Sequence, residues 1–352
     1  MDRNLLELTR SVERDCQRVD RLMTQVAKDL LENAAEPLLS DQERALMWGV
    51  LSDLIATVAA AIAGRLPASL TQSNHRPVVY TATRSDSADA SALLQLLRDT
   101  GTLHDPALIR LVYARTKAHL LSETLRTGAG GATVAESDRM AESLLDADTL
   151  VRLRHREIES IDRYGDPRLP IEDLPAELRE RLYWDVAAAL RLLLLDSDAA
   201  ETAFIDDRIE AATAEILQQP LPLPEADRLR DAASIPPSSL VEALERGEIF
   251  LFLMLFGRMT GLPLGRIREL AFGGGEAEFA AVCRAIEIPR CAFAELYLLV
   301  HQHSRKTVRD ACALAGALNM YDTIDRRQAA DLLRLWRRHP RYLGALRRVT
   351  GG

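Results

Sequence analysis

Three short segments in the last third of the chain share one pattern. They read "IPPSSL", "LPLGRI" and "IPRCAF", and each has an aliphatic residue, a proline, three variable residues and an apolar residue. Their prolines, Pro236, Pro263 and Pro289, recur at spacings of 27 and 26 residues. Proline suits the first turn of a helix because its missing N–H would have no partner there, so each is predicted to start a short helix. Such a period is typical of stacked helical hairpins, in which each unit covers the apolar face of its neighbour.

A second repetition links two segments that are far apart in the sequence. The stretch "LLSDQERALMWGVLSDL" (38–54) is similar to "LPAELRERLYWDVAAAL" (174–190), and a shift of 136 positions places Trp48 on Trp184. We expect these two tryptophans to fill the core of the repeated unit. The alternative is an exposed groove that binds a partner, because aromatic residues are favoured anchors in protein interfaces.

The composition also favours helices. Aromatic residues make up only 5% of the chain, whereas hydrophobic residues reach 47% and are mostly Leu and Ala. Strands favour the β-branched and aromatic residues that are scarce here. The sequence therefore predicts an all-α fold without a sheet, built of stacked helical hairpins as a HEAT-like α-solenoid or as helical-repeat domains.

Several features predict a cytoplasmic protein. Charged residues in "MDRNLLELTR" stand where a secretory segment would have its apolar core. The longest uncharged apolar runs, "LIATVAAAIAG" and "IFLFLMLFG", are shorter than the roughly 20 residues that span a bilayer. The four cysteines, at positions 16, 283, 291 and 312, have neither the density of a disulfide scaffold nor the spacing of a zinc module. A reducing compartment fits this pattern.

The patterning divides the chain into eight stretches. These are an N-terminal amphipathic helix (1–36), a first helical pair (37–69), a polar connector (70–91), a helical hairpin region (92–135), a second helical region with the repeated motif (136–219), a Pro-rich linker (220–234), Pro-started helical repeats (235–320) and a basic C-terminal helix (321–352). Apolar residues of the first helix alternate in steps of three and four, which fits a helix packed on its own domain or a coiled-coil seam in a homodimer. The packed helix is the favoured interpretation.

Part of the chain resembles a known family. The segments that carry the resemblance are "EDLPAELRERLYWDVAAALR", "SLVEALERGEIFLF" and "TGLPLGRIRELAFGGGEAEFAAVCRAIEIPRCAFAEL". They are similar to the bacterial domain of unknown function 2336 family, and residues 38–66 resemble the N-terminal helix pair of that family. The resemblance implies a bacterial, α-helical, HEAT-like repeat protein. It implies no catalytic residues.

The candidates for metal chemistry are few. His301 and His303 could bind a metal, but residues two apart on a helix point in different directions, and the nearest carboxylate, Glu295, lies almost two turns back. The segment "LDSDAAE" (195–201) contains Asp196, Asp198 and Glu201 but lacks the central Gly and the later Glu of a calcium loop. It is interpreted as a loop with a helix cap.

Covalent and phosphate chemistry find no support either. The chain has no serine in a nucleophile-elbow pattern, and "FGGGEAEF" lacks the Lys and Ser/Thr of a phosphate-binding loop. Cys283 and Cys291 fall on apolar stretches and are expected to be buried structural thiols. The sequence therefore predicts no catalysis, no cofactor and no metal site.

Charge is concentrated at the C-terminus. Residues 326–348 contain eight arginines and one acid, a formal charge of +7, which leaves −15 for the rest of a chain whose net charge is −8. Apolar residues at 329, 332, 333 and 336 share one helix face, with arginines around it. A basic amphipathic helix of this kind can bind anionic lipid, nucleic acid or an acidic protein. The favoured interpretation is that it closes the repeat stack.

Together these features predict a non-catalytic protein-interaction scaffold or regulator in bacterial signalling. The partner is expected to be another protein, and the alternatives are binding of an anionic polymer or membrane surface and a metal-dependent enzyme. The residues predicted as candidates for partner binding are Trp48, Trp184, Arg334, Arg337, Arg338 and Arg341.

Overall fold

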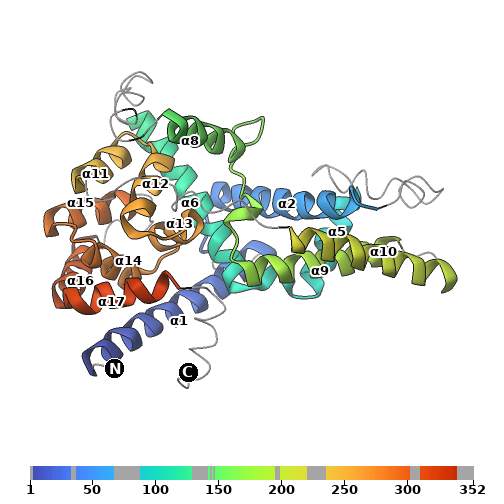
Figure 1. Ribbon diagram of the computed structural model, residues 1–352, viewed down its shortest axis with the longest axis horizontal. Helices are drawn as coiled ribbons and strands as arrows, with labels where there is room; N and C mark the ends of the chain where they lie inside the picture. The colour runs from blue at the N-terminus through green and yellow to red at the C-terminus, as the bar shows by residue number, and fades with distance from the viewer. Residues whose placement is uncertain are drawn as a thin grey trace. The chain divides into compact units, whose positions relative to one another are not determined.

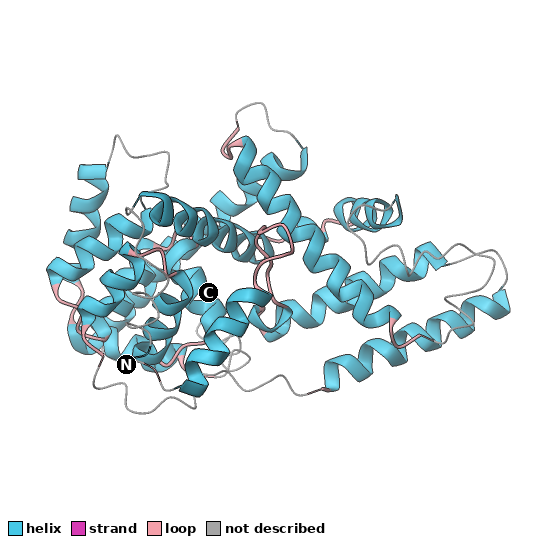
Figure 2. Cartoon of the chain, turned by 90° about the horizontal axis from the view of Figure 1, so that it is seen from above, coloured by secondary structure: helices cyan, strands magenta, loops and turns pink. Residues whose placement is uncertain are grey.

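The computed structural model describes residues 3–32, 37–66, 88–128, 142, 145, 147–194, 199–219, 235–301 and 310–338. Within these residues the chain forms fourteen α-helices and two short 3-10 helices, and it contains no β-strand (Figures 1 and 2). The predicted all-α fold is confirmed. The HEAT-like form of the repeat stays a prediction.

The chain folds into two compact units, each assembled from separate segments. Unit 1 consists of Met1–Leu22, Tyr113–Asp162 and Leu223–Gly352, and unit 2 consists of Met23–Val112 and Arg163–Pro222. Two long helices, α1 (Arg3–Glu32) and α6 (Pro106–Gly128), contribute residues to both units. The repeated prolines belong to unit 1, and the repeated tryptophans belong to unit 2.

Unit 1 contains the end of α6 and a series of shorter helices. In chain order these are α8 (Ala147–Glu159), α11 (Pro237–Glu245), α12 (Ile249–Thr260), α13 (Leu264–Phe272), α14 (Glu276–Ala285), α15 (Arg290–His301), α16 (Asp310–Thr323) and α17 (Arg326–Trp336). Consecutive helices pack as pairs, α11 with α12, α13 with α14 and α15 with α16. The spacing of the three prolines thus corresponds to successive helix pairs.

Each repeated proline lies at the N-cap of a helix. Helices α11 and α13 begin directly after Pro236 and Pro263. At the third site the backbone N–H of Phe293 donates to the carbonyl oxygen of Pro289 at 2.8 Å, which marks the start of α15. The predicted helix starts are confirmed. Proline suits this position because its carbonyl oxygen can accept the first helical hydrogen bond, and its ring nitrogen carries no N–H that would need an acceptor.

Aromatic rings connect the helix pairs through the core of unit 1. Phe256 on α12 meets Phe279 on α14 with ring centroids 5.8 Å apart, and Phe279 meets Phe293 on α15 at 6.0 Å. Phe293 in turn stacks on Tyr321 of α16 at 4.6 Å. Such ring pairs stabilise a core beyond the area they bury. This aromatic series joins every pair of the stack to the next.

The N-terminal half of α1 packs into unit 1. Val12 belongs to the hydrophobic core, and the carboxylate of Asp15 accepts a hydrogen bond from the backbone N–H of Ala277 at 2.8 Å, in the first turn of α14. The seam continues with Val19 and Met23, which are also buried. The described part of the seam, from Val12 to Met23, is therefore packed within the chain, while a homodimer through this helix stays a prediction.

Unit 2 is built around α9. Its helices are α2 (Asp41–Ala63), α5 (Ala88–Asp99), α9 (Ala176–Leu194) and α10 (Ala199–Gln218), with the 3-10 turns η1 (Thr102–His104) and η2 (Ile171–Asp173). Helix α9 contacts α2, α5 and α10. The two copies of the tryptophan motif form α2 and α9, so the sequence repetition corresponds to two helices that pack on one another.

Some predicted segments fall outside the described residues. These include all of the Pro-rich linker 220–234 and most of the polar connector, of which only residues 88–91 are described, as the first turn of α5. Asp196 and Asp198 also lie outside, whereas Glu201 belongs to α10.

One described helix, α2, is long and apolar enough to cross a membrane, and a bent pair formed by α12 and α13 passes the same test when taken as one span. The apolar run in α2 is longer than the sequence suggested, because the helix includes residues before Asp53 that carry no charge. Half of its most apolar stretch is buried inside the protein. The mostly buried core helix of a soluble protein and a signal sequence pass the same test.

Candidate interaction surfaces

The two repeated tryptophans have nearly equal exposure. Trp48 on α2 is 37% exposed and Trp184 on α9 is 38% exposed. The expectation that they fill the core of the repeat is therefore wrong, and their arrangement corresponds to the alternative of exposed aromatic anchors. The two copies of the motif thus leave the indole exposed to the same extent.

The residue before each tryptophan takes the core position instead. Met47 is fully buried and Tyr183 is 5% exposed. Val50 and Val186, at equivalent positions three residues further on, are fully buried as well. A step of one residue turns a helix by about 100°, so each tryptophan lies just beyond the buried face.

On α9 the exposed tryptophan continues into an apolar stripe. Trp184, Ala188 and Leu192 follow one another at intervals of four residues, and all three are exposed, Leu192 by 53%. Side chains four apart lie on the same helix face. We call these three residues the α9 stripe. An exposed apolar stripe on a helix is typical of protein interaction sites.

The C-terminal helix α17 packs against α14 through its apolar face. Ala329, Leu332 and Leu333 are between 1% and 3% exposed. Trp336 is half-buried, and the guanidinium group of Arg266 lies 5.7 Å from the centre of its ring. The apolar face that the sequence predicted is thus used inside unit 1.

The described arginines of the basic segment differ in their contacts. Arg337 donates from Nε to the backbone carbonyl oxygen of Thr260 at 2.7 Å, at the C-terminal end of α12. Arg334 is mostly exposed and pairs with Asp331 on its own helix. Arg338 is exposed, and Arg341 lies outside the described residues.

A partly buried ionic network lies beside α17. Arg266 on α13 forms ion pairs with Glu269, at 2.9 Å, and with Glu278 on α14, whose side chain is 2% exposed. Burial acts to lower the pKa of Arg266, but the two carboxylates outweigh it and the pKa is raised. The pairing with Arg266 offsets the cost of burying the Glu278 carboxylate.

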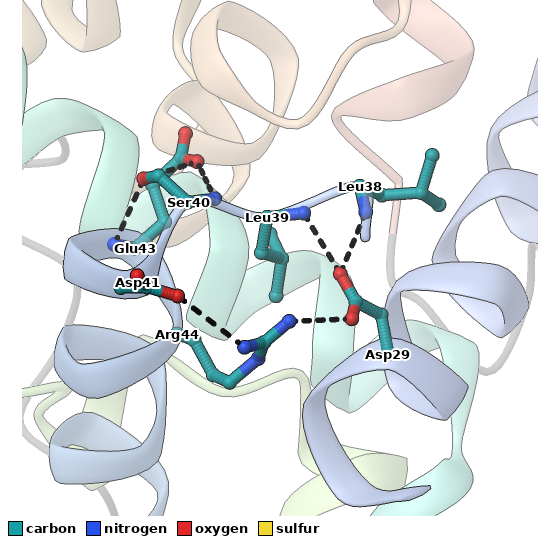
Figure 3. A network of polar contacts seen from close by, with 7 residues as sticks. All are labelled: Asp29, Leu38, Leu39, Ser40, Asp41, Glu43 and Arg44. Atoms are coloured by element: carbon teal, nitrogen blue, oxygen red, sulfur yellow. Dashed lines mark hydrogen bonds and ion pairs between the residues drawn. The ribbon is translucent and has the colours of Figure 1, made fainter. Parts of the chain in front are cut away.

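A second network fixes the start of the first tryptophan helix (Figure 3). The carboxylate of Asp29, fully buried at the end of α1, accepts hydrogen bonds from the backbone N–H groups of Leu38 and Leu39, both at 2.8 Å. It also pairs with Arg44 on α2 at 2.7 Å. Beside it, the side chains of Ser40 and Glu43 cap the first turn of α2 reciprocally. This network orients α2 and with it Trp48.

Sequence reasoning missed both networks for different reasons. The Ser-x-x-Glu pattern at Ser40 is a sequence signature of a capping box and could have been found. Asp29 and Arg266 carry no such signal, because ordinary charged residues on an amphipathic helix are usually solvated.

A match to a family model supports the resemblance. Residues 156–334, about half of the chain, match the family described as an uncharacterised protein conserved in bacteria, the domain of unknown function 2336. The chain belongs to this family. No curated protein and no solved structure matches it. The segment matched by the 2336 family includes Trp184 and Arg334, whereas Trp48 and Arg337 lie outside it.

The predicted histidine and cysteine residues lie as follows. Nδ1 of His301 is 2.9 Å from the carbonyl oxygen of Tyr297, and the two rings stack with centroids 4.3 Å apart. His303 lies outside the described residues, and the described part of the chain has no group of three His, Cys, Asp or Glu residues suited to a metal ion.

Cys283 is fully buried, which raises the pKa of its thiol. Cys291 is exposed, contrary to expectation, because it lies in the first turn of α15 on the side away from the buried Phe293.

Proposed function

We propose that this protein is a non-catalytic interaction module, a scaffold or regulator in bacterial signalling, that acts in the cytoplasm and binds a partner protein through its exposed tryptophans. The observation that carries the proposal is the matched exposure of Trp48 and Trp184 beside buried Met47 and Tyr183. A large aromatic residue that is more than one third exposed twice, at the same position of a repeated helix, is better suited to a partner than to the core.

The α9 stripe adds to this argument. A partner helix or loop that covers Trp184 would also cover Leu192, which is more exposed than either tryptophan. Removing this apolar surface from water would provide the favourable free energy of association. The proposal assigns no reaction to the protein.

The contacts of α17 support a closing role for the basic helix rather than anion binding. Its apolar face would have to leave α14 before it could enter a membrane surface, and Arg337 would have to give up its bond to Thr260. Closure of the stack is therefore the function that we propose for α17.

The test is affinity capture from a bacterial lysate, followed by measurement of Kd with the purified partner. Trp184→Ala should weaken binding by at least about tenfold, since hot-spot tryptophans contribute about 2 kcal/mol or more. Trp48→Ala tests the first copy in the same way. Both variants should keep the thermal midpoint of the wild-type protein, whereas Met47→Ala, which removes a fully buried side chain, should lower it. Equal Kd values for the wild type and both tryptophan variants would refute the proposal.

A further inference from the structure

The basic residues that border the α9 stripe are already neutralised. Two arginines of α9 lie three residues from a member of the stripe and therefore on the same side of the helix. Arg181 pairs with Asp105, and Arg191 pairs with Asp206 on α10. Neither arginine thus adds net positive charge to this surface.

Two acids of α9 border the stripe without a cation beside them. Glu177 is exposed and lies seven residues, or two turns, before Trp184 on the same helix face. Asp185 follows Trp184 directly and accepts a hydrogen bond from the hydroxyl group of Thr102 at 3.2 Å. Neither carboxylate forms an ion pair with a residue that the structure describes.

A third acid comes from α10. This helix follows α9 in the chain and packs on it, the arrangement of an antiparallel helical hairpin. Glu210 is exposed and lies one turn after Asp206, which pairs with Arg191, so it is placed beside the middle of α9. It too has no ion pair within the described part of the chain. We call Glu177, Asp185 and Glu210 the acidic rim.

The whole hairpin has the same sign of charge. Helices α9 and α10 together contain eight acids and four arginines, a formal charge of −4. A surface of this sign attracts cationic ligands and repels polyanions. The charge around the stripe therefore favours a basic partner.

The shape of the stripe favours a helix as its ligand. Trp184, Ala188 and Leu192 form a row with a spacing of four, the kind of ridge that packs against the corresponding rows of another helix. The row covers eight residues, or about 12 Å. Ala188, at its centre, is the smallest of the three, so a side chain of the partner can lie between the two larger ones.

The first copy of the motif lacks this surface. The shift of 136 residues places Ala188 on Ser52 and Leu192 on Ala56, and both residues of α2 are only 8% exposed. The exposed face therefore does not continue beyond Trp48 as it does on α9. A ligand that needs an extended apolar row is suited to the second copy.

We infer that the partner covers the α9 stripe with a basic amphipathic helix, whose apolar side chains contact the stripe and whose Lys or Arg side chains pair with the acidic rim. This inference rests on the proposed function, because it specifies the chemistry of the partner that binds Trp184. Apolar residues of an amphipathic helix recur every three or four positions, which matches the spacing of the stripe. Anionic lipid and nucleic acid do not match, since their phosphates would face the acidic rim.

The chemistry can be tested with synthetic peptides. The probe is an amphipathic peptide of leucine and lysine, about 18 residues or five turns long, and its control has glutamate in place of every lysine. Both carry a fluorescent label, and binding to the intact protein is measured by fluorescence anisotropy. The lysine peptide should bind at least about tenfold more tightly than the glutamate peptide, and its Kd should rise with salt.

The decisive variants place opposite charges at one position. Ala188→Arg and Ala188→Glu each add a long charged side chain at an exposed site in the centre of the stripe, and both new residues favour helices. Ala188→Arg should raise the Kd of the lysine peptide by about tenfold or more, because like charges repel. Ala188→Glu should raise it by less than about threefold. Thermal midpoints close to that of the wild type show that neither variant loses its fold.

A second set of variants tests the acidic rim. Its three acids are changed together to their amides, which should raise the Kd of the lysine peptide by about fivefold and make it less sensitive to salt. The matched control removes the same charge from exposed positions of unit 1, with the substitutions Glu13→Gln, Glu245→Gln and Glu295→Gln. This control should change the Kd by less than about twofold.

The outcomes separate this inference from the proposed function. Equal Kd values for the two peptides, equal effects of Ala188→Arg and Ala188→Glu, or equal effects of the rim and control variants would each refute the basic helix, even where partner capture depends on Trp184. If the charge effects are as expected but Trp184→Ala changes neither peptide nor partner binding, the basic ligand stands and the tryptophan proposal fails.

Discussion

Gly261 and Glu287 occupy equivalent backbone positions in successive turns of unit 1, although only one of them is a glycine. Both have left-handed φ angles, 64° and 62°, and each lies two residues before a repeated proline. Glu287 is the one non-glycine residue with a positive φ in the described part of the chain. Helix α17 reaches both turns, since Arg337 bonds to Thr260 beside Gly261 and Arg326 pairs with Glu287.

The first prediction concerns these two turns. Gly261→Ala should lower the free energy of unfolding by about 1 to 2 kcal/mol, because alanine is strained at this φ and its Cβ would lie 3.1 Å from Nε of Arg337. Glu287→Gly should change it by less than about 1 kcal/mol, since relief of strain is offset by greater unfolded-state entropy and by loss of an exposed ion pair. Urea denaturation measures both. If Glu287→Gly is as damaging as Gly261→Ala, the pair with Arg326 governs the turn, and Arg326→Ala should show the same loss.

The second prediction compares the effect of a glycine-to-alanine substitution on the free energy of unfolding at two positions, Gly247 and Gly316. Gly247→Ala should destabilise unit 1 by about 2 kcal/mol or more, because φ is 72° and a Cβ would lie 2.9 Å from Cγ of Arg126 and 3.0 Å from the backbone oxygen of Ser122. The control is Gly316→Ala, inside α16, where a Cβ would have nothing within 4 Å. Alanine favours the helix there and should raise the free energy of unfolding by up to about 1 kcal/mol. Equal effects at the two sites would contradict the prediction.

The third prediction concerns acid sensitivity. Burial acts to raise the pKa of Asp29, but the backbone N–H of Leu39, the side chain of Arg44 and the N–H of Leu38 stabilise the ionised form, and the pKa is lowered. A depressed folded-state pKa stabilises the protein above the unfolded-state value of about 3.9, and this contribution is lost as pH falls through the folded-state value.

Asp29→Asn should therefore lower the free energy of unfolding at pH 7 by about 2 to 4 kcal/mol, because it leaves Arg44 and a backbone donor without their acceptor. The deficit should shrink in acid, where the wild type loses the same contribution. Asp41→Asn provides the control, since this exposed carboxylate lies 3.6 Å from the same arginine and should have an effect near zero. Denaturant titrations at pH 7 and pH 3 provide the comparison. A deficit that is equal at both pH values would show that Asp29 acts through something other than its charge.

The fourth prediction separates the two faces of α17. Leu332→Ala should cost about 2 to 5 kcal/mol, since the side chain is 2% exposed. Arg334→Ala should change the free energy of unfolding by less than about 0.5 kcal/mol, because the side chain is 71% exposed and its partner is on the same helix.

Binding of the intact protein to duplex DNA or anionic vesicles should be weak, because the rest of the protein is acidic. Tight, salt-sensitive binding that is lost when Arg334, Arg337, Arg338 and Arg341 are all changed to Ala would contradict this expectation.

Repetition in the sequence was the most informative guide to the fold. The prolines at 236, 263 and 289 mark helix starts because proline excludes most other backbone positions, and this constraint is local. The similarity between the segments around Trp48 and Trp184 predicted two equivalent helices, because segments with the same pattern of apolar and charged residues favour the same local structure. The exposure of the tryptophans could not be derived in this way. Met and Trp are adjacent apolar residues in "LMW", and which of them faces the core depends on the helices packed around α2.

The candidate sites show the same limit. The apolar face of α17 could be predicted because its period is that of a helix. The partner of Arg337 could not, since Thr260 is 77 residues away and contributes only a backbone carbonyl.

The bond between Asp15 and Ala277 sets an order of events during synthesis on the ribosome. The two residues are separated by 262 positions, and unit 1 is complete only when segments from both ends of the chain are present. At roughly 5 to 20 residues per second, α1 emerges about 13 to 52 s before the first turn of α14 that its carboxylate caps. All of unit 2, by contrast, lies between positions 23 and 222, so it can finish folding before the residues that pack against the N-terminal part of α1 have been synthesised. During that interval Val12 and its neighbours are an apolar segment that a chaperone can bind.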